Sequence, residues 1–168
     1  MKSHRYESDC KGCQVSQGID VPGGVVRLPG NWRLNSYGGS EGFLGWLALQ
    51  PRYHRMSLAE LLPDELRELG PNIRAIDRAI TQYWKEEYSD PVERLYVIYF
   101  FESADEEPFH LHLHLIPRFR SLSAEMRAWK VAKATKNKLF PSTYTREAVE
   151  YADRVRRLMD YLRHELER

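Results

Sequence analysis

The chain has 168 residues, of which 42% are hydrophobic and 29% charged, and its formal net charge is +1 at neutral pH. This length suits one domain with its own hydrophobic core, and the near-zero charge predicts neither general nucleic-acid binding nor attachment to a membrane surface. No apolar run is long enough for a transmembrane helix, and the polar first nine residues lack the character of a signal peptide, so we expect a cytoplasmic protein.

Two cysteines near the N-terminus, Cys10 and Cys13, form a C-x-x-C pair. In a reducing compartment this spacing indicates a metal site or a redox pair rather than a structural disulfide. A thioredoxin-like redox pair is disfavoured because no βαβ unit follows, and a pair of free thiols remains the simple alternative.

Four segments have the β-branched, aromatic or continuously apolar character of strands. They are residues 25–28, 31–35, 43–50 and 95–101. Between the third and the fourth, an S-x-x-E motif at 57–60 predicts the start of a helical turn. Apolar residues spaced by three and four from Leu66 then predict an amphipathic helix to about Glu87. Gly70-Pro71 interrupts this pattern, so we expect a kink or two abutting helices.

A fifth strand is predicted over residues 109–118, FHLHLHLIPR, where histidine alternates with leucine. Strict alternation places the leucines on a core face and His110, His112 and His114 in a row on the other. Three imidazoles on one face can bind a catalytic metal. Alternatively His112 can act as a nucleophile on phosphorus while its neighbours orient the phosphate and protonate the leaving group. The residues alone leave both readings open.

The end of the chain changes character to helix. A basic segment near 124–136 follows Ser123, which can cap it, and residues 145–167 carry one apolar face. The sequence therefore predicts an α+β fold with an antiparallel sheet and one long helix in residues 1–118. Residues 119–168 form a C-terminal helical extension packed on the same domain.

A tetrahedral metal site on the cysteine pair needs two further ligands. His54 lies just beyond the end of the strand at 43–50, where a fixed backbone can aim it. One histidine of the 109–118 strand can supply the fourth ligand. The predicted site is thus Cys10, Cys13, His54 and a triad histidine.

The segment 110–116, HLHLHLI, resembles the H-φ-H-φ-H-φ-φ motif (φ, apolar) that defines the histidine-triad (HIT) superfamily. The segment 45–54, GWLALQPRYH, is similar to the family's strand that ends in a Pro-Arg/Lys-x-His turn, and residues 57–61 resemble the helix entry that follows it. The resemblance covers about residues 10–118. It implies a HIT-like fold and a homodimer, for which an exposed apolar face on residues 66–84 would be suitable.

The resemblance also implies roles for single residues. His112 matches the nucleophile that takes a nucleotide's α-phosphate, and His114 matches the histidine that contacts the phosphate or leaving group in hydrolase branches. In zinc-containing members the positions of Cys10, Cys13, His54 and His110 hold a structural Zn²⁺. The expected function is therefore hydrolysis of a nucleoside phosphoramidate or dinucleoside polyphosphate through a nucleotidyl-histidine intermediate, with a triad of His110, His112 and His114.

Three departures from the family pattern favour an alternative, a catalytically weak nucleotide- or protein-binding module. Residues 105–107 are acidic where the family has a Gly-x-Ser/Thr loop that holds phosphate. Trp46 stands where many members carry histidine, and Asn35 is the nearest match to the family's acidic ribose contact. Basic residues from Arg118 to Lys136 can supply positive charge, although a solvated basic helix face is the favoured interpretation.

Overall fold

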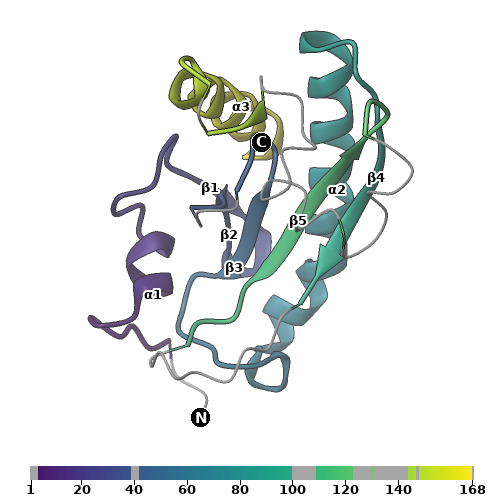
Figure 1. The fold of residues 1–168 in the computed structure, drawn as a ribbon. Coiled ribbons are helices and arrows are strands. Elements are labelled where there is room, and N and C mark those ends of the chain that lie inside the picture. The colour runs from purple at the N-terminus through teal and green to yellow at the C-terminus, as the bar shows by residue number, and fades with distance from the viewer. Residues whose placement is uncertain are drawn as a thin grey trace.

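The computed structural model describes residues 4–38, 42–99, 109–122, 130, 144–146 and 148–167. Within these ranges five strands form one antiparallel sheet in the order β1-β2-β3-β5-β4. The strands are β1 (Val25–Leu28), β2 (Trp32–Ser36), β3 (Leu47–Pro51), β4 (Val92–Ile98) and β5 (Leu113–Phe119). The helices are α1 (Lys11–Ser16), α2 (Pro63–Glu87) and α3 (Tyr151–Leu166), with 3₁₀ turns η1 (Pro29–Asn31) and η2 (Leu58–Glu60). The predicted α+β class and five-stranded antiparallel sheet are confirmed (Figure 1).

The predicted third strand is too long at its start. Residues 43–46 form a turn, and β3 begins only at Leu47. The reason is Gly45, whose φ is +95° and where a Cβ atom would come within 2.7 Å of the Trp84 ring. A left-handed backbone at such a close approach ends a strand. β4 begins at Val92, three residues before its predicted start, and residues 100–101 lie outside the described ranges.

The helical turn predicted at the S-x-x-E motif is confirmed. It is the turn η2, beside which Glu60 accepts a hydrogen bond from the Met56 N–H (2.7 Å). α2 starts after this turn, at Pro63, where the Glu65 carboxylate accepts from the Leu62 N–H (2.7 Å). From there it continues through Pro71 to Glu87 as one helix. Of the two predicted alternatives, two abutting helices is wrong, and a kink at Gly70-Pro71 stays a prediction. Burial of its apolar face against the sheet outweighs the hydrogen bond that proline removes.

α2 covers the leucine face of the sheet. Trp84 stacks on Phe119 with ring centroids 5.0 Å apart, and Ile76 and Ile80 are fully buried. The apolar face of residues 66–84 is therefore largely internal, and it is not the exposed dimer surface that we expected. α3 packs beside α2, where Tyr83 and Tyr161 lie 5.1 Å apart (Figure 1).

α3 begins at Tyr151, six residues after the predicted helix start, and the predicted basic helix at 124–136 falls almost wholly outside the described residues. α1 is an element that the sequence analysis missed. It lies on the histidine face of the sheet, where the Gln50 side chain donates to the Gly12 carbonyl (3.1 Å). Among the described helices, none combines the length and apolarity needed to cross a membrane.

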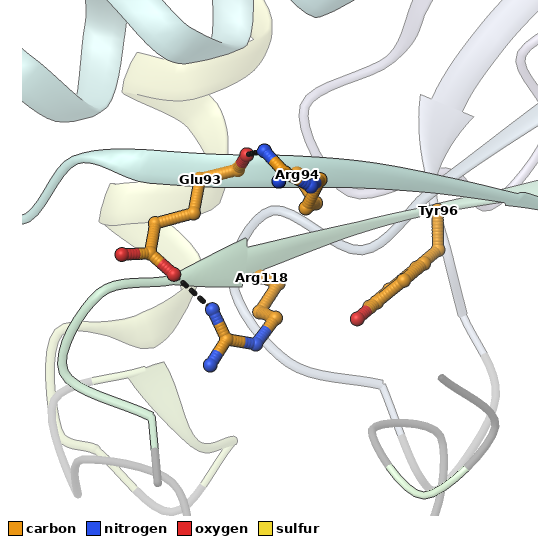
Figure 2. A pocket seen from close by; sticks show the side chains of 4 residues that line it. All are labelled: Glu93, Arg94, Tyr96 and Arg118. Atoms are coloured by element: carbon orange, nitrogen blue, oxygen red, sulfur yellow. Dashed lines mark hydrogen bonds and ion pairs between the residues drawn. The ribbon is translucent and has the colours of Figure 1, made fainter. Parts of the chain in front are cut away.

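The far end of β5 pairs with β4 through an irregularity between Val92 and Arg94. Arg94 and Arg118 are cross-strand partners there, and the Glu93 carboxylate forms an ion pair with Arg118 (Figure 2). Together with Tyr96 these side chains line a hollow of about 340 Å³. Arg118, counted in the sequence analysis as a source of positive charge, is therefore largely neutralised by its neighbour.

Candidate functional site

The histidine segment is only partly a strand. β5 starts at Leu113, paired with Leu49 of β3, whereas His110 and His112 precede it. Before Leu113 the main chain makes a hydrogen bond outside the sheet, since the Leu111 N–H donates to the Arg55 carbonyl (2.7 Å). The strand predicted over residues 109–118 therefore begins later in the structure, at Leu113.

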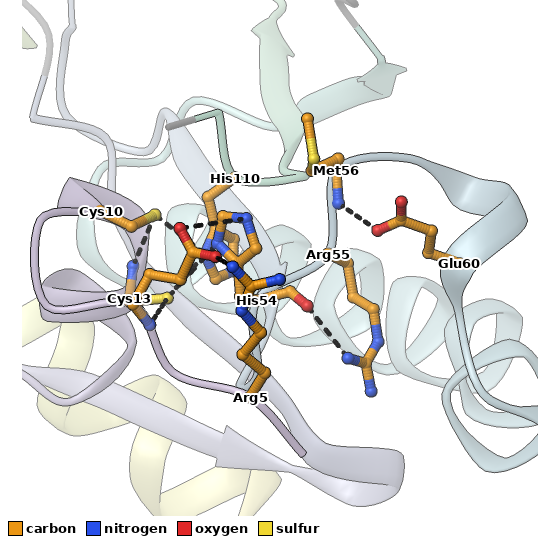
Figure 3. Close-up of polar contacts among 9 residues, drawn as sticks. Arg5, Cys10, Cys13, His54, Arg55, Met56, Glu60 and His110 are labelled. Atoms are coloured by element: carbon orange, nitrogen blue, oxygen red, sulfur yellow. Dashed lines mark hydrogen bonds and ion pairs between the residues drawn. The ribbon is translucent and has the colours of Figure 1, made fainter. Parts of the chain in front are cut away.

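Cys10, Cys13, His54 and His110 form a buried cluster whose ligand atoms all lie within 4.8 Å of one another (Figure 3). The Cys10 and Cys13 sulfurs each lie 3.5 Å from the His110 Nδ1 atom, and the Cys13 sulfur lies 3.6 Å from the His54 Nδ1 atom. Three distant parts of the sequence meet at this point: the N-terminal segment with both cysteines, the turn at His54 and the histidine segment. These four residues could bind a metal ion.

The surroundings of the cluster suit a cation. The His110 Nε2 atom lies 2.9 Å from the Pro51 carbonyl, which can only accept, so the proton is on Nε2 and the Nδ1 lone pair faces the sulfurs. Burial raises the pKa of Cys10 to about 11, so a positive charge is needed to hold it as a thiolate. Gly12 is required between the cysteines, because a Cβ there would lie 2.3 Å from the His110 Cβ.

Main-chain amides also point at the sulfurs. The Cys13 N–H donates to the Cys10 sulfur (3.4 Å), and the Glu7 N–H donates to the Cys13 sulfur (3.5 Å). The N-terminal segment also contacts His54, because the main-chain N–H of His54 donates to the Arg5 carbonyl (2.8 Å). The segment that the sequence analysis treated as a polar tail is thus bound to the cluster.

His112 is half-buried, and its Nδ1 atom lies 2.9 Å from the main-chain carbonyl of His110. A carbonyl oxygen cannot donate, so Nδ1 carries the proton and Nε2 keeps its lone pair. Neutral imidazole in this tautomer is a nucleophile whose far nitrogen is fixed.

His114 is oriented by a residue that the sequence analysis recorded only as a departure. The Trp46 indole N–H donates to the His114 Nδ1 atom (3.0 Å), so this ring carries its proton on Nε2. Burial and then the neighbouring His112 lower the pKa of His114 to about 4, which keeps it neutral near pH 7. The two rings meet edge to face, with centroids 4.8 Å apart.

Aromatic rings enclose this part of the sheet. Tyr37 stacks on Trp46 with centroids 4.7 Å apart and meets His114 edge to face at 4.9 Å. In the sequence, the one feature that could have indicated this arrangement is Trp46 itself, because its indole N–H is a donor that can fix a neighbouring imidazole.

Asn35 lies in the same cross-strand row as His114, with Ala48 of β3 between them. It is buried, its amide nitrogen donates to the Ser36 carbonyl (2.9 Å), and its Oδ1 atom has no hydrogen-bond partner in the structure described. A buried acceptor without a partner is costly and suits a ligand hydroxyl. The acidic residues 105–107 lie outside the described ranges.

Comparison with known proteins adds no relative to these observations: the sequence matches no protein-family model and no curated protein.

Proposed function

We propose that this protein is a HIT-type hydrolase that cleaves a nucleoside phosphoramidate or dinucleoside polyphosphate at the α-phosphorus. The observation that carries the proposal is the tautomer of His112, whose Nδ1–H is held by the His110 carbonyl at 2.9 Å. This bond directs the Nε2 lone pair away from the main chain, as a nucleophile requires.

In the first step the His112 Nε2 atom attacks the α-phosphorus, a P–N bond forms, and the bond from phosphorus to the leaving amine or phosphate breaks with its electron pair. The leaving group takes a proton from solvent. His114, neutral because its pKa is lowered to about 4, serves as an N–H donor to the phosphoryl oxygens rather than as the acid. In the second step water attacks the same phosphorus and gives a proton to solvent, the bond from phosphorus to the His112 Nε2 atom breaks with its electron pair returning to nitrogen, and the nucleoside monophosphate leaves.

We further propose that the metal is a structural zinc ion held by Cys10, Cys13, His54 and His110. Tetrahedral zinc with Zn–S of about 2.3 Å and Zn–N of about 2.05 Å separates sulfur from nitrogen by roughly 3.6 Å. The three S···N distances, 3.5, 3.5 and 3.6 Å, agree with this spacing. Four protein ligands leave no position for water, so zinc would brace the segment that carries His112 rather than act on substrate.

The remaining parts of the proposal concern binding. The Oδ1 atom of Asn35 would accept a hydrogen bond from a ribose hydroxyl. The protein would work in a reducing compartment, the cytoplasm, where both cysteines stay available to the metal. A homodimer is part of the same proposal and is tested by its mass in solution.

The test is a single-turnover assay with adenosine phosphoramidate and with a diadenosine polyphosphate, comparing the wild type with His112→Ala and His164→Ala. We expect product release from the wild type and from His164→Ala, which changes an exposed histidine on α3. Intact-mass spectra of reactions quenched at alkaline pH, where the bond between phosphorus and histidine nitrogen persists, should show a nucleotidyl adduct on the wild type and on His164→Ala but not on His112→Ala. Nucleotide binding with no more product than His112→Ala would instead identify the protein as a binding module.

A further inference from the structure

Three arginines gather on the histidine face of the sheet, two strands away from the triad. Arg27 of β1 and Arg33 of β2 are direct cross-strand partners, so their side chains share one face. Arg33 pairs in turn with Gln50 of β3. Arg52 follows the end of that strand and lies close enough to Arg33 to lower its pKa. We call Arg27, Arg33 and Arg52 the arginine cluster.

Arg33 is the unusual member because it is only 8% exposed and no carboxylate among the described residues pairs with it. Its guanidinium donates to the Trp32 main-chain carbonyl (2.8 Å), and no ion pair in the described structure includes it. Burial, then Arg52 and Arg27, lower the pKa of Arg33. A buried cation beside two like charges is costly unless an anion compensates it.

No carboxylate in the described ranges forms an ion pair with the other two arginines either. The Arg52 Nε atom donates to the Tyr6 hydroxyl (2.7 Å), and its guanidinium lies 5.2 Å from the centroid of the Tyr53 ring. Both contacts orient the side chain without cancelling its charge. Glu167 accepts from the main-chain N–H of Arg27 (2.6 Å) and forms no ion pair with its guanidinium.

The same sheet contains a matched contrast. Arg94 and Arg118 are also direct cross-strand partners, but Glu93 lies beside them and its carboxylate pairs with Arg118. Like charges opposite one another on a sheet are destabilising, and at that pair the chain supplies the compensating carboxylate. At Arg27 and Arg33 the described part of the chain supplies none.

We propose that the arginine cluster is a binding site for a phosphate group, distinct from the phosphorus that His112 attacks. Guanidinium groups are the preferred partners of phosphate oxygens, and three of them match a dianion. Under the proposed function, the two strand spacings between Arg33 and the triad, roughly 10 Å, are within reach of a second phosphate of the substrate. The binding of phosphate itself does not depend on that function.

The test measures binding of inorganic phosphate and pyrophosphate by calorimetry and thermal shift, in wild type, Arg33→Gln, Arg52→Gln, His112→Ala and the control Arg67→Gln. Arg67 is an exposed arginine of α2 paired with Asp64, so its removal changes net charge equally. We expect phosphate to stabilise the wild type, His112→Ala and Arg67→Gln, and to bind about tenfold more weakly to the two cluster variants. In buffer free of anions Arg33→Gln should melt no lower than the wild type, because it removes an uncompensated charge.

Phosphate affinity that survives in Arg33→Gln and Arg52→Gln but is lost in His112→Ala would place the ion at the triad and overturn the proposal. Equal affinity in every variant, or none in the wild type, would overturn it as well. Failure of His112 chemistry in the turnover assay leaves these binding measurements unaffected, so the two proposals are separately testable.

Discussion

The indole N–H of Trp46 donates to the Nδ1 atom of His114 across a distance of 3.0 Å. A neutral donor therefore fixes the tautomer of one triad histidine, whereas the carbonyl of His110 fixes that of His112. The two rings carry their protons on opposite nitrogens, so one is suited to attack and the other to donate.

Substituting Trp46→Phe should free His114 to exchange between tautomers while keeping an aromatic ring in place. We expect turnover to fall by about tenfold to a hundredfold, as for the loss of one oriented donor. Nitrogen-15 NMR of the imidazoles reports the tautomer directly. Trp32→Phe is the matched control, because it removes an indole hydrogen bond to the Glu65 carbonyl on the opposite face of the sheet. An unchanged His114 spectrum in Trp46→Phe would contradict this role.

The free energy of unfolding should decrease as the pH falls, because His114 binds a proton less readily in the folded chain than in the unfolded one. Its pKa is about 4 in the folded chain and 6.5 in the unfolded one, so as pH falls the unfolded state binds the proton first. The contribution is therefore complete above pH 6.5 and is lost between 6.5 and about 4, up to about 3 kcal/mol. Urea unfolding of wild type and His114→Gln from pH 4 to 7 measures it as the difference between the two pH profiles. Parallel profiles would show that His114 does not carry the effect.

Metal content should be one ion per chain and should depend on Cys13. Substituting Cys13→Ser or Gly12→Ala should release the metal and lower the melting temperature, the second because the new Cβ would meet His110 at 2.3 Å. Elemental analysis and thermal unfolding, with and without a chelator, check both. His164→Gln, at a histidine outside the cluster, should keep the metal. Full metal content in Cys13→Ser would refute the ligand set.

Changing one partner of the buried ion pair between Arg55 and Glu65 should strongly destabilise the folded protein. Their side chains are 4% and 0% exposed and meet at 2.9 Å, and Arg55 also holds Leu111 through its carbonyl. Glu65→Gln leaves a buried guanidinium without its charge partner and should cost about 3–5 kcal/mol. Asp64→Asn, which breaks the exposed pair with Arg67, should cost less than about 1 kcal/mol. Equal losses in urea unfolding would contradict this distinction.

The sequence by itself determined the class of the fold and three of the four residues of the buried cluster that could bind a metal ion, Cys10, Cys13 and His54. Period-two and period-three-to-four patterns identify strands and the long helix because side chains must alternate or repeat on a buried face. Few residues in the chain have sulfur or imidazole ligands, so Cys10, Cys13 and His54 could be selected by their chemistry.

Only the tertiary structure decided how these side chains are oriented. The turn at Gly45 depends on contact with Trp84, and the continuity of α2 through Pro71 depends on packing against the sheet. The hydrogen bond from Trp46 to His114 and the juxtaposition of Arg27 with Arg33 both join different strands. Such contacts depend on register and on three-dimensional proximity, which local sequence patterns do not encode.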